Sequence, residues 1–259
     1  MQHCDILIKP RWCVTGEGQL TVHEKHAVAV TDGKIAAILP NAEAERLFQP
    51  SRSVERPGHI LIPGLINAHA HAAMTLFRGF ADDLLLEAWL QERIWPAEKR
   101  WMGPEFVRDG TALAVAEMLR AGVTCFADQY FYPEIVANTA VDLNIRAVIA
   151  TPVLDFKTEW ANDAAEYLQK GADLVHDAYA DHPLITTAFA PHSTGVLSDE
   201  TFTALRVMAD QLDCPVQIHL HETQNEVSHE TKRTGLRPVA RLARLGLVNR
   251  SLLAVHAVH

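Results

Sequence analysis

The sequence PGLINAHAH at residues 63–71 gives the first indication of the fold, because an apolar run ends there in two histidines one residue apart. Side chains at positions i and i+2 of a β-strand point to the same side. His69 and His71 can therefore face one metal ion from the end of a buried strand. Spacing alone is weak evidence, since 14 histidines in 259 residues give about 0.75 such pairs by chance. His219 and His221 form a second pair, so the positions of the other histidines decide the interpretation.

Composition and charge describe a globular protein and limit its partners. The 259 residues are 48% hydrophobic and 21% charged, which is ordinary for one or two folded domains. A net charge of −9 argues against nucleic acid or an anionic membrane as a partner. The first ten residues lack the apolar core of a signal peptide, and no apolar run approaches the ~18 residues of a membrane span. The four scattered cysteines are typical of reduced thiols, so we expect a cytoplasmic protein.

The pattern of apolar residues changes near residue 59. Residues 1–58 are typical of β-structure, with a hairpin turn at Asp32-Gly33 between strands at 27–31 and 34–39. From residue 59 onward, compact apolar runs alternate with helical stretches, of which 104–121 is the clearest. Such runs are expected of strands buried on both faces. The predicted strands are 60–67, 123–128, 146–154, 184–190, 216–220 and 252–255.

Six strand–helix steps in one direction predict an α/β protein with a parallel sheet, either doubly wound or a (β/α)8 TIM barrel. No G-x-G-x-x-G motif follows a predicted strand. Polar side chains instead follow several different strands: His69 and His71 the first, His192 the fourth, His219 the fifth and His256 the sixth. A doubly wound sheet would concentrate them at one point, whereas a barrel collects them from many strand ends. The sequence therefore favours the barrel.

Seven stretches of this chain, taken in order, resemble the amidohydrolase superfamily, and within it the methylthioadenosine/S-adenosylhomocysteine deaminases and triazine hydrolases. They are DGKIAAI, LIPGLINAHAHAAMTLFRGFADD, WLQERIWPAE, GVTCFADQYF, PHS, QIHLHET and AVHAVH. The resemblance implies a small β-sandwich domain at residues 1–58 and a metal-dependent hydrolase barrel at 59–259.

The resemblance also implies roles for individual residues. His69, His71 and His219 match the metal ligands of the family. Glu222 matches its proton shuttle, and His256 matches the histidine that orients the water and the substrate.

Three further residues match positions at which the family binds substrate. Trp89 and Glu98 would contact the nucleoside, and His192 would line the pocket. From the residues alone, Trp89 in an apolar run is equally typical of core packing, and Glu98 begins a charged stretch typical of a solvated surface. His192 could be a buried core histidine, and His259 competes with His256 for its role.

The activity implied is a hydrolytic deaminase that releases ammonia from methylthioadenosine or S-adenosylhomocysteine through a metal-activated water. The fourth predicted strand lacks the lysine that bridges two metals in other members, which favours one divalent ion, zinc or iron. We therefore expect a small-molecule partner, while the oligomeric state stays open. The alternatives are a deaminase or chlorohydrolase of guanine, a pterin or an s-triazine, and a homologue without catalytic activity.

Three features depart from the family pattern. The chain ends after the sixth strand, so we expect a barrel truncated after about six βα units, without the aspartate that ends strand eight. PHS is followed by TGVLS without the usual proline-tyrosine pair, and strand three ends without an arginine. Both weaken the homocysteine assignment more than the deaminase assignment. The basic residues between 232 and 244 are expected to form a solvated helix face.

Overall fold

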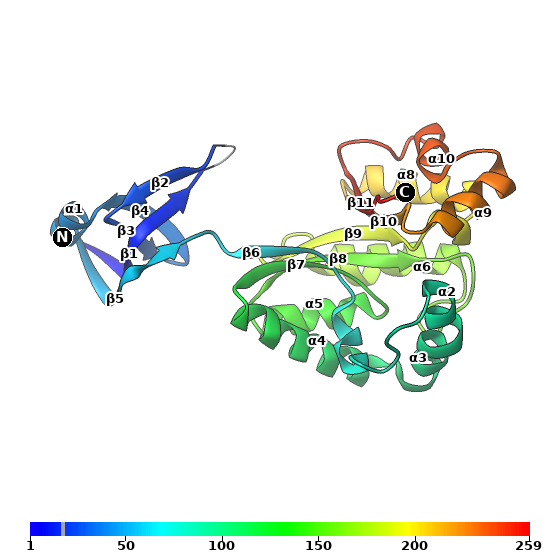
Figure 1. Cartoon of the computed structure of the whole chain (residues 1–259), viewed down its shortest axis with the longest axis horizontal. Helices are drawn as coiled ribbons and strands as arrows, with labels where there is room; N and C mark the ends of the chain where they lie inside the picture. The colour runs from blue at the N-terminus through cyan, green and yellow to red at the C-terminus, as the bar shows by residue number, and fades with distance from the viewer. Residues whose placement is uncertain (17–18) are drawn as a thin grey trace. The chain divides into compact units, whose positions relative to one another are not determined.

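The computed structural model describes residues 1–16 and 19–259, which divide into two compact units, Met1–Gly64 and Leu65–His259 (Figure 1). The first unit holds a five-stranded sheet of order β2-β1-β3-β4, with β5 pairing parallel to β1, and a short helix α1. Its elements are β1 (Gln2–Thr15), β2 (Thr21–Glu24), β3 (His26–Thr31), β4 (Lys34–Pro40), α1 (Asn41–Leu47) and β5 (Phe48–Leu61). The assignment of residues 1–58 and 59–259 to a sandwich and a barrel domain stays a prediction.

The predicted hairpin is confirmed. Strands β3 and β4 pair antiparallel, with Thr31 opposite Lys34. The two turn residues, Asp32 and Gly33, have φ angles of 51° and 70°. Positive φ at both central residues is what a tight hairpin turn requires, and Gly adopts it without strain.

The second unit is a six-stranded parallel sheet of order β11-β10-β9-β8-β7-β6, in which every strand neighbours the strands next to it in sequence. This order is that of a TIM barrel and lacks the reversal of a doubly wound sheet. Its strands are β6 (Leu65–Ala70), β7 (Val123–Gln129), β8 (Arg146–Val153), β9 (Ile185–Pro191), β10 (Val216–Leu220) and β11 (Leu252–His256). The fold class is therefore α/β, as predicted, with six barrel strands, the first five of which are followed by helices.

Helices connect these strands, and most pack on one face of the sheet (Figure 1). The longest, α4, runs from Pro104 to Arg120, close to its predicted bounds. The hydroxyl of Ser198 accepts a hydrogen bond from the backbone N–H of Thr201 and so caps α8. The helical elements are η1 (Ala72–Phe77), α2 (Leu86–Ala88), η2 (Trp89–Ile94), α3 (Trp95–Trp101), α4 (Pro104–Arg120), α5 (Pro133–Asp142), α6 (Ala164–Lys170), η3 (Gly171–His176), α7 (Asp177–Tyr179), η4 (Thr194–Val196), α8 (Asp199–Gln211), α9 (Gln224–Thr234) and α10 (Pro238–Arg244).

The first barrel strand lies later in the chain than predicted. Ile60 and Leu61 belong to β5, where they pair with Trp12 and Cys13 of β1, and the barrel strand β6 begins at Leu65. The expectation of one strand over 60–67 is therefore wrong. Pro63-Gly64 divides the apolar run into the end of one strand and the start of the next.

The alternation of side chains along β10 decides which residues reach the site. Val216, Ile218 and Leu220 join the hydrophobic cluster that contains residues of α8. Successive side chains of a strand point to opposite faces, so Gln217 and His219 share the other face. That face carries small residues on the neighbouring strands, where Ala150 of β8 packs with Ala188 and Ala190 of β9.

The basic residues of α9 and α10 do not form a solvated face throughout, which corrects the expectation for 232–244. Arg241 is 1% exposed and contacts the buried carboxylate of Glu230 at 2.9 Å and the partly exposed carboxylate of Asp199 at 2.7 Å. Its guanidinium also donates to the carbonyls of Thr194 and Leu197. The acidic partners lie far from Arg241 in the sequence or on another helix, so the charge run conceals them.

Within residues 1–16 and 19–259, no helix has the length and apolar character needed to cross a membrane.

Candidate metal centre

The three predicted metal ligands lie together at the carboxyl ends of the first and fifth barrel strands. His69 is the last but one residue of β6, His71 directly follows this strand, and His219 lies in β10. One ring nitrogen from each of the three histidines lies within 4.8 Å of the ring nitrogens from the other two. The Nε2 atoms of His69 and His219, 150 residues apart in sequence, are separated by 3.2 Å. The fold therefore gathers three imidazoles around a common point.

The Nδ1 atom of each of these rings contacts a polar group of another strand or loop. His71 Nδ1 donates to the carbonyl of Gln129 at 2.5 Å, and His219 Nδ1 donates to the carbonyl of His192 at 2.9 Å. Because a carbonyl only accepts, both rings carry their proton on Nδ1 and leave a lone pair on Nε2. His69 Nδ1 lies 3.0 Å from the side-chain nitrogen of Gln217. Such outer contacts orient metal-binding imidazoles in proteins.

The three rings are neutral at pH 7. Burial, with a contribution from neighbouring imidazoles, lowers the pKa of His69 to about 4 and that of His219 to about 2. Burial also lowers the pKa of His71. Neutral imidazole is the form that binds a metal ion, and nitrogen donors suit zinc or iron. The residues present therefore fit a divalent transition metal.

Glu222 and His256 lie beside this cluster. Glu222 Oε1 lies 3.4 Å from His256 Nε2, and the His256 ring stacks on that of His219 with centroids 5.5 Å apart. The backbone N–H of Glu222 donates to Glu226 at 2.7 Å, which fixes the turn after β10. Burial raises the pKa of Glu222, an effect that His256 opposes and Glu226 reinforces. A carboxylate of raised pKa next to a metal site can accept and return a proton.

Of the three predicted substrate residues, two have contacts that link them to the cluster. Glu98 in α3 is 8% exposed, and the hydroxyl of Tyr130 donates to its Oε1 at 2.7 Å. The Tyr130 ring lies 6.3 Å from that of His71. Burial raises the pKa of Glu98. The solvated surface that is typical of its charged stretch is therefore not the environment of Glu98.

The His192 ring lies 4.9 Å from that of His219, and burial lowers the pKa of His192 to about 4. Trp89 lies in η2 and is partly buried. In the described part of the chain, no hydrogen bond or ring contact joins Trp89 to the three histidines. Its role stays a prediction, as do the roles of Glu98 and His192.

Four residues with contacts to this site were not singled out from the sequence: Asp128, Gln129, Tyr130 and Gln217. Asp128 is 2% exposed, and its Oδ1 accepts from the backbone N–H of Ala72, the residue after His71, at 2.6 Å. Burial raises the pKa of Asp128 to about 7. The i, i+2 rule that places His69 beside His71 also places Gln217 beside His219, and this signal was available in the sequence.

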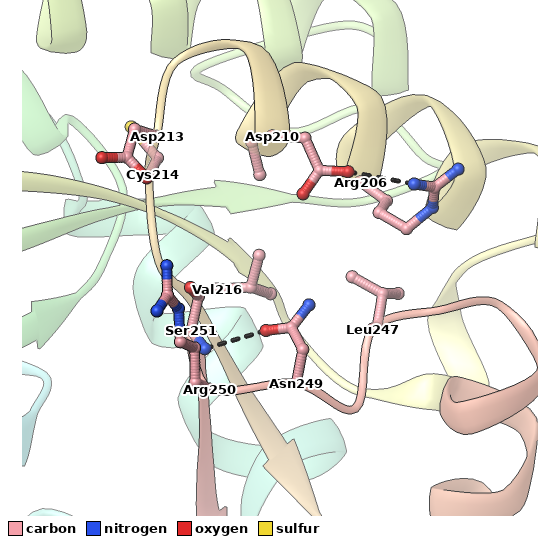
Figure 2. Close-up of a pocket in the computed structure, with 10 residues that line it drawn as sticks. Arg206, Asp210, Asp213, Cys214, Val216, Leu247, Asn249, Arg250 and Ser251 are labelled. Atoms are coloured by element: carbon pink, nitrogen blue, oxygen red, sulfur yellow. Dashed lines mark hydrogen bonds and ion pairs between the residues drawn. The ribbon is translucent and has the colours of Figure 1, made fainter.

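A cavity of about 260 Å³ lies at the opposite end of the same strands (Figure 2). It is lined by α8 and by the segments that precede β10 and β11. Two of its charged residues, Arg206 and Asp210, pair with each other at 3.0 Å. Cys214 at its wall is 6% exposed, and burial raises the pKa of its thiol. The cavity is separate from the histidine cluster.

The chain is similar in sequence to curated proteins of known name. The chain is 44% identical over 252 residues to a 5-methylthioadenosine/S-adenosylhomocysteine deaminase of Saccharophagus degradans, covering 97% of this chain and 56% of that protein. It is 37% identical over 199 residues to a 5'-deoxyadenosine deaminase of Methanothrix thermoacetophila, covering 77% of this chain and 46% of the relative. The chain thus spans about half the length of the curated relatives it matches.

Solved structures share the fold. An adenosine deaminase from Xanthomonas campestris with bound zinc is 49% identical and superposes with a TM-score of 0.95, covering 98% of this chain and 57% of that one. An atrazine chlorohydrolase from Arthrobacter aurescens, 22% identical, has a TM-score of 0.86 over 95% of this chain and 59% of its own, and supports the fold alone. The model of the amidohydrolase family matches residues 60–259. The resemblance drawn from the sequence motifs is therefore confirmed, and this chain belongs to the amidohydrolase family.

Proposed function

We propose that this protein is a metal-dependent hydrolytic deaminase that releases ammonia from an adenine-type nucleoside such as methylthioadenosine or S-adenosylhomocysteine. The observation that carries the proposal is the convergence of three neutral imidazoles, His69, His71 and His219, next to the carboxylate of Glu222. The names of the relatives support the substrate class, since they include deaminases of methylthioadenosine, S-adenosylhomocysteine and 5'-deoxyadenosine.

The three histidines would hold one divalent ion through Nε2. When bound, the ion would act as a Lewis acid that lowers the pKa of a water molecule, so that the water can lose a proton and attack the substrate at neutral pH. Glu222 would take one proton of that water and deliver it to the purine ring nitrogen, and would then pass the second proton, from the newly attached hydroxyl group, to the departing amine. The raised pKa of Glu222 suits both halves of this transfer. His256, 3.4 Å from Glu222, keeps the carboxylate directed at the attacking water and the substrate.

The remaining residues would bind the nucleoside. Glu98 has one oxygen occupied by the Tyr130 hydroxyl, so the other can accept from a substrate hydroxyl group. Trp89 would contact the nucleoside, and His192 would line the pocket beside His219. These assignments rest on the match to the family motifs and on the burial of Glu98 and His192 near the cluster.

We further propose zinc as the metal, a small molecule as the substrate, and a cytoplasmic location. Zinc is supported by the ion bound in the Xanthomonas structure and by the set of nitrogen donors. The four cysteines are unpaired, which fits a reducing compartment. Elemental analysis of protein purified without added metal tests the first point. Iron in place of zinc would contradict it.

The decisive experiment measures ammonia release by zinc-loaded protein from methylthioadenosine, S-adenosylhomocysteine, 5'-deoxyadenosine, guanine, a pterin and an s-triazine. We expect release from the adenine nucleosides. Glu222→Gln should lower kcat by roughly 10²–10⁴-fold because proton transfer is lost, while zinc content stays at that of wild type. Ammonia release from guanine, the pterin or the triazine, without release from the adenine nucleosides, would contradict the proposed substrate class. No release by protein that contains zinc would favour the homologue without catalytic activity.

A further inference from the structure

Two buried amides connect the metal-binding histidines inside the sheet. Gln217 and Gln129 are 2% and 3% exposed. The Gln217 side-chain nitrogen lies 3.0 Å from His69 Nδ1 and donates to Gln129 Oε1 at 3.3 Å. The backbone carbonyl of Gln129 accepts from His71 Nδ1. Gln129 therefore supports His71 through its main chain and His69 through Gln217.

His69 differs from the other two ligands in what faces its Nδ1. The carbonyls behind His71 and His219 can only accept, whereas the Gln217 amide can donate or accept according to which end it presents. In the present arrangement its NH2 group donates to His69 Nδ1. The ring proton then lies on Nε2, which donates to Nε2 of His219 at 3.2 Å. In this tautomer His69 has no lone pair on Nε2 for a metal ion.

Turning both amides over gives a second arrangement in which the amides make the same number of hydrogen bonds. Gln217 Oε1 would accept from His69 Nδ1–H and from the side-chain nitrogen of Gln129. Each arrangement leaves one end of each amide without a hydrogen-bond partner. In the arrangement seen in the structure, the atoms without a partner among the described residues are Gln217 Oε1 and Gln129 Nε2. The amide hydrogen bonds favour neither arrangement, whereas the His69–His219 bond exists only in the first, so the tautomer of His69 selects between them. The proton that leaves Nε2 is replaced by one at Nδ1, and the charge of the ring is unchanged.

We propose that Gln217 and Gln129 form a reversible amide relay that couples the tautomer of His69 to metal occupancy. Gln217 is a positioning residue, since it acts through His69 and contacts neither metal nor substrate. The relay rests on the metal centre of the proposed function and is independent of which substrate that centre serves.

Zinc affinity of Gln217 variants, measured by competition with a chelator, tests the relay. Gln217→Met removes the polar contact at similar volume and should weaken zinc binding roughly 10–100-fold, the usual effect of losing such a support. Gln217→Glu restores affinity to that of wild type or better, because a carboxylate only accepts and holds the Nδ1–H tautomer. Gln211→Met on the exposed end of α8 is the control, with unchanged affinity. Wild-type affinity in Gln217→Met would overturn the relay.

A spectroscopic signature separates the relay from a merely structural role. In protein with ¹⁵N-labelled histidine, the His69 resonances, identified by their loss in His69→Ala, should show the proton on Nε2 without metal and on Nδ1 with zinc. Gln217→Glu should show Nδ1–H in both states. Nδ1–H in metal-free wild type would contradict the relay while leaving the centre intact. Wild-type protein that binds no zinc would reject the centre itself and the relay with it.

Discussion

The carboxyl group of Asp128 lies next to the turn that follows His69 and His71. It is fully buried at the end of β7, and its one hydrogen bond comes from the backbone N–H of Ala72. Burial penalises the charged form and raises the pKa from 3.8 to about 7, although the hydrogen bond lowers it. Between these two values the folded protein holds a proton that the unfolded chain has released. The contribution to stability is therefore full below about pH 3.8 and is lost as pH rises through about 7.

Asp128→Asn should remove this pH dependence, because Asn retains an oxygen that accepts from Ala72 and cannot ionise. Relative to wild type, the free energy of unfolding of the variant should rise between pH 4 and pH 8, by on the order of 1–3 kcal/mol. Urea unfolding of metal-free protein at several pH values measures it. A constant difference between the two proteins across this range would show that the carboxyl group does not titrate there.

At the scale of residues, the ligands could be predicted and their supports could not. His69, His71 and His219 follow from strand spacing and from their positions after apolar runs. The i, i+2 rule places Gln217 on the strand face of His219, but nothing local in the sequence indicates that Gln217 and Gln129 contact each other and the two other histidines. The burial of Arg241 was hidden for the same reason, since Asp199 lies 42 residues away.

Gly110 brings α4 against the turn after His71. A Cβ atom at this position would lie 2.3 Å from the carbonyl oxygen of Ala73 in η1, closer than real contacts allow. Helix and turn can approach this closely only because glycine lacks that atom. The position of His71 relative to β10 therefore depends on a residue of a distant helix.

Gly110→Ala should lower the free energy of unfolding by about 1–3 kcal/mol through overpacking and should weaken zinc binding, since η1 must shift. Gly103→Ala is the matched control at the start of the same helix, where an added Cβ meets nothing within 4 Å. Thermal unfolding and chelator competition measure both effects. Equal behaviour of the two variants would contradict the importance of the close approach.

Arg241 joins α10 to α8 and α9 through buried charges. Its removal in Arg241→Met would leave Glu230, itself 1% exposed, with Arg233 as its one charged partner among the described residues. Loss of one partner of a buried pair costs roughly 3 kcal/mol or more of unfolding free energy. Arg206→Met, which removes a more exposed pair with Asp210, should change it by less than about 1 kcal/mol. Denaturant unfolding compares the two, and a similar small loss in both would contradict the assignment.

At the scale of elements, five of the six barrel strands begin and end close to their predicted residues, because each is a compact apolar run between breaks. The first strand is the exception. Its run continues from the preceding strand across Pro63-Gly64, and only the pairing of Ile60 with Trp12 shows where one strand ends. Apolar periodicity locates strands, whereas their partners depend on contacts that are distant in sequence.

The division of the whole chain has a measurable consequence for metal binding. The three histidines belong to the unit Leu65–His259, whereas Met1–Gly64 has its own cluster of buried residues around Leu7 and Phe48. Calorimetry should therefore resolve two unfolding transitions, of which saturating zinc raises only one. At a thousand times Kd the stabilisation is about 4 kcal/mol, or roughly 10 °C for a unit of this size. One transition that moves as a whole would contradict this separation.

The position of Gln129 restricts how this scaffold can be re-engineered. Its main chain and its side chain steady two different ligands, so both depend on the register of a single strand end. One residue inserted into β7 would turn the Gln129 side chain to the opposite face of the sheet. Libraries that lengthen or shorten this strand should therefore weaken metal binding through two of the three histidines at once.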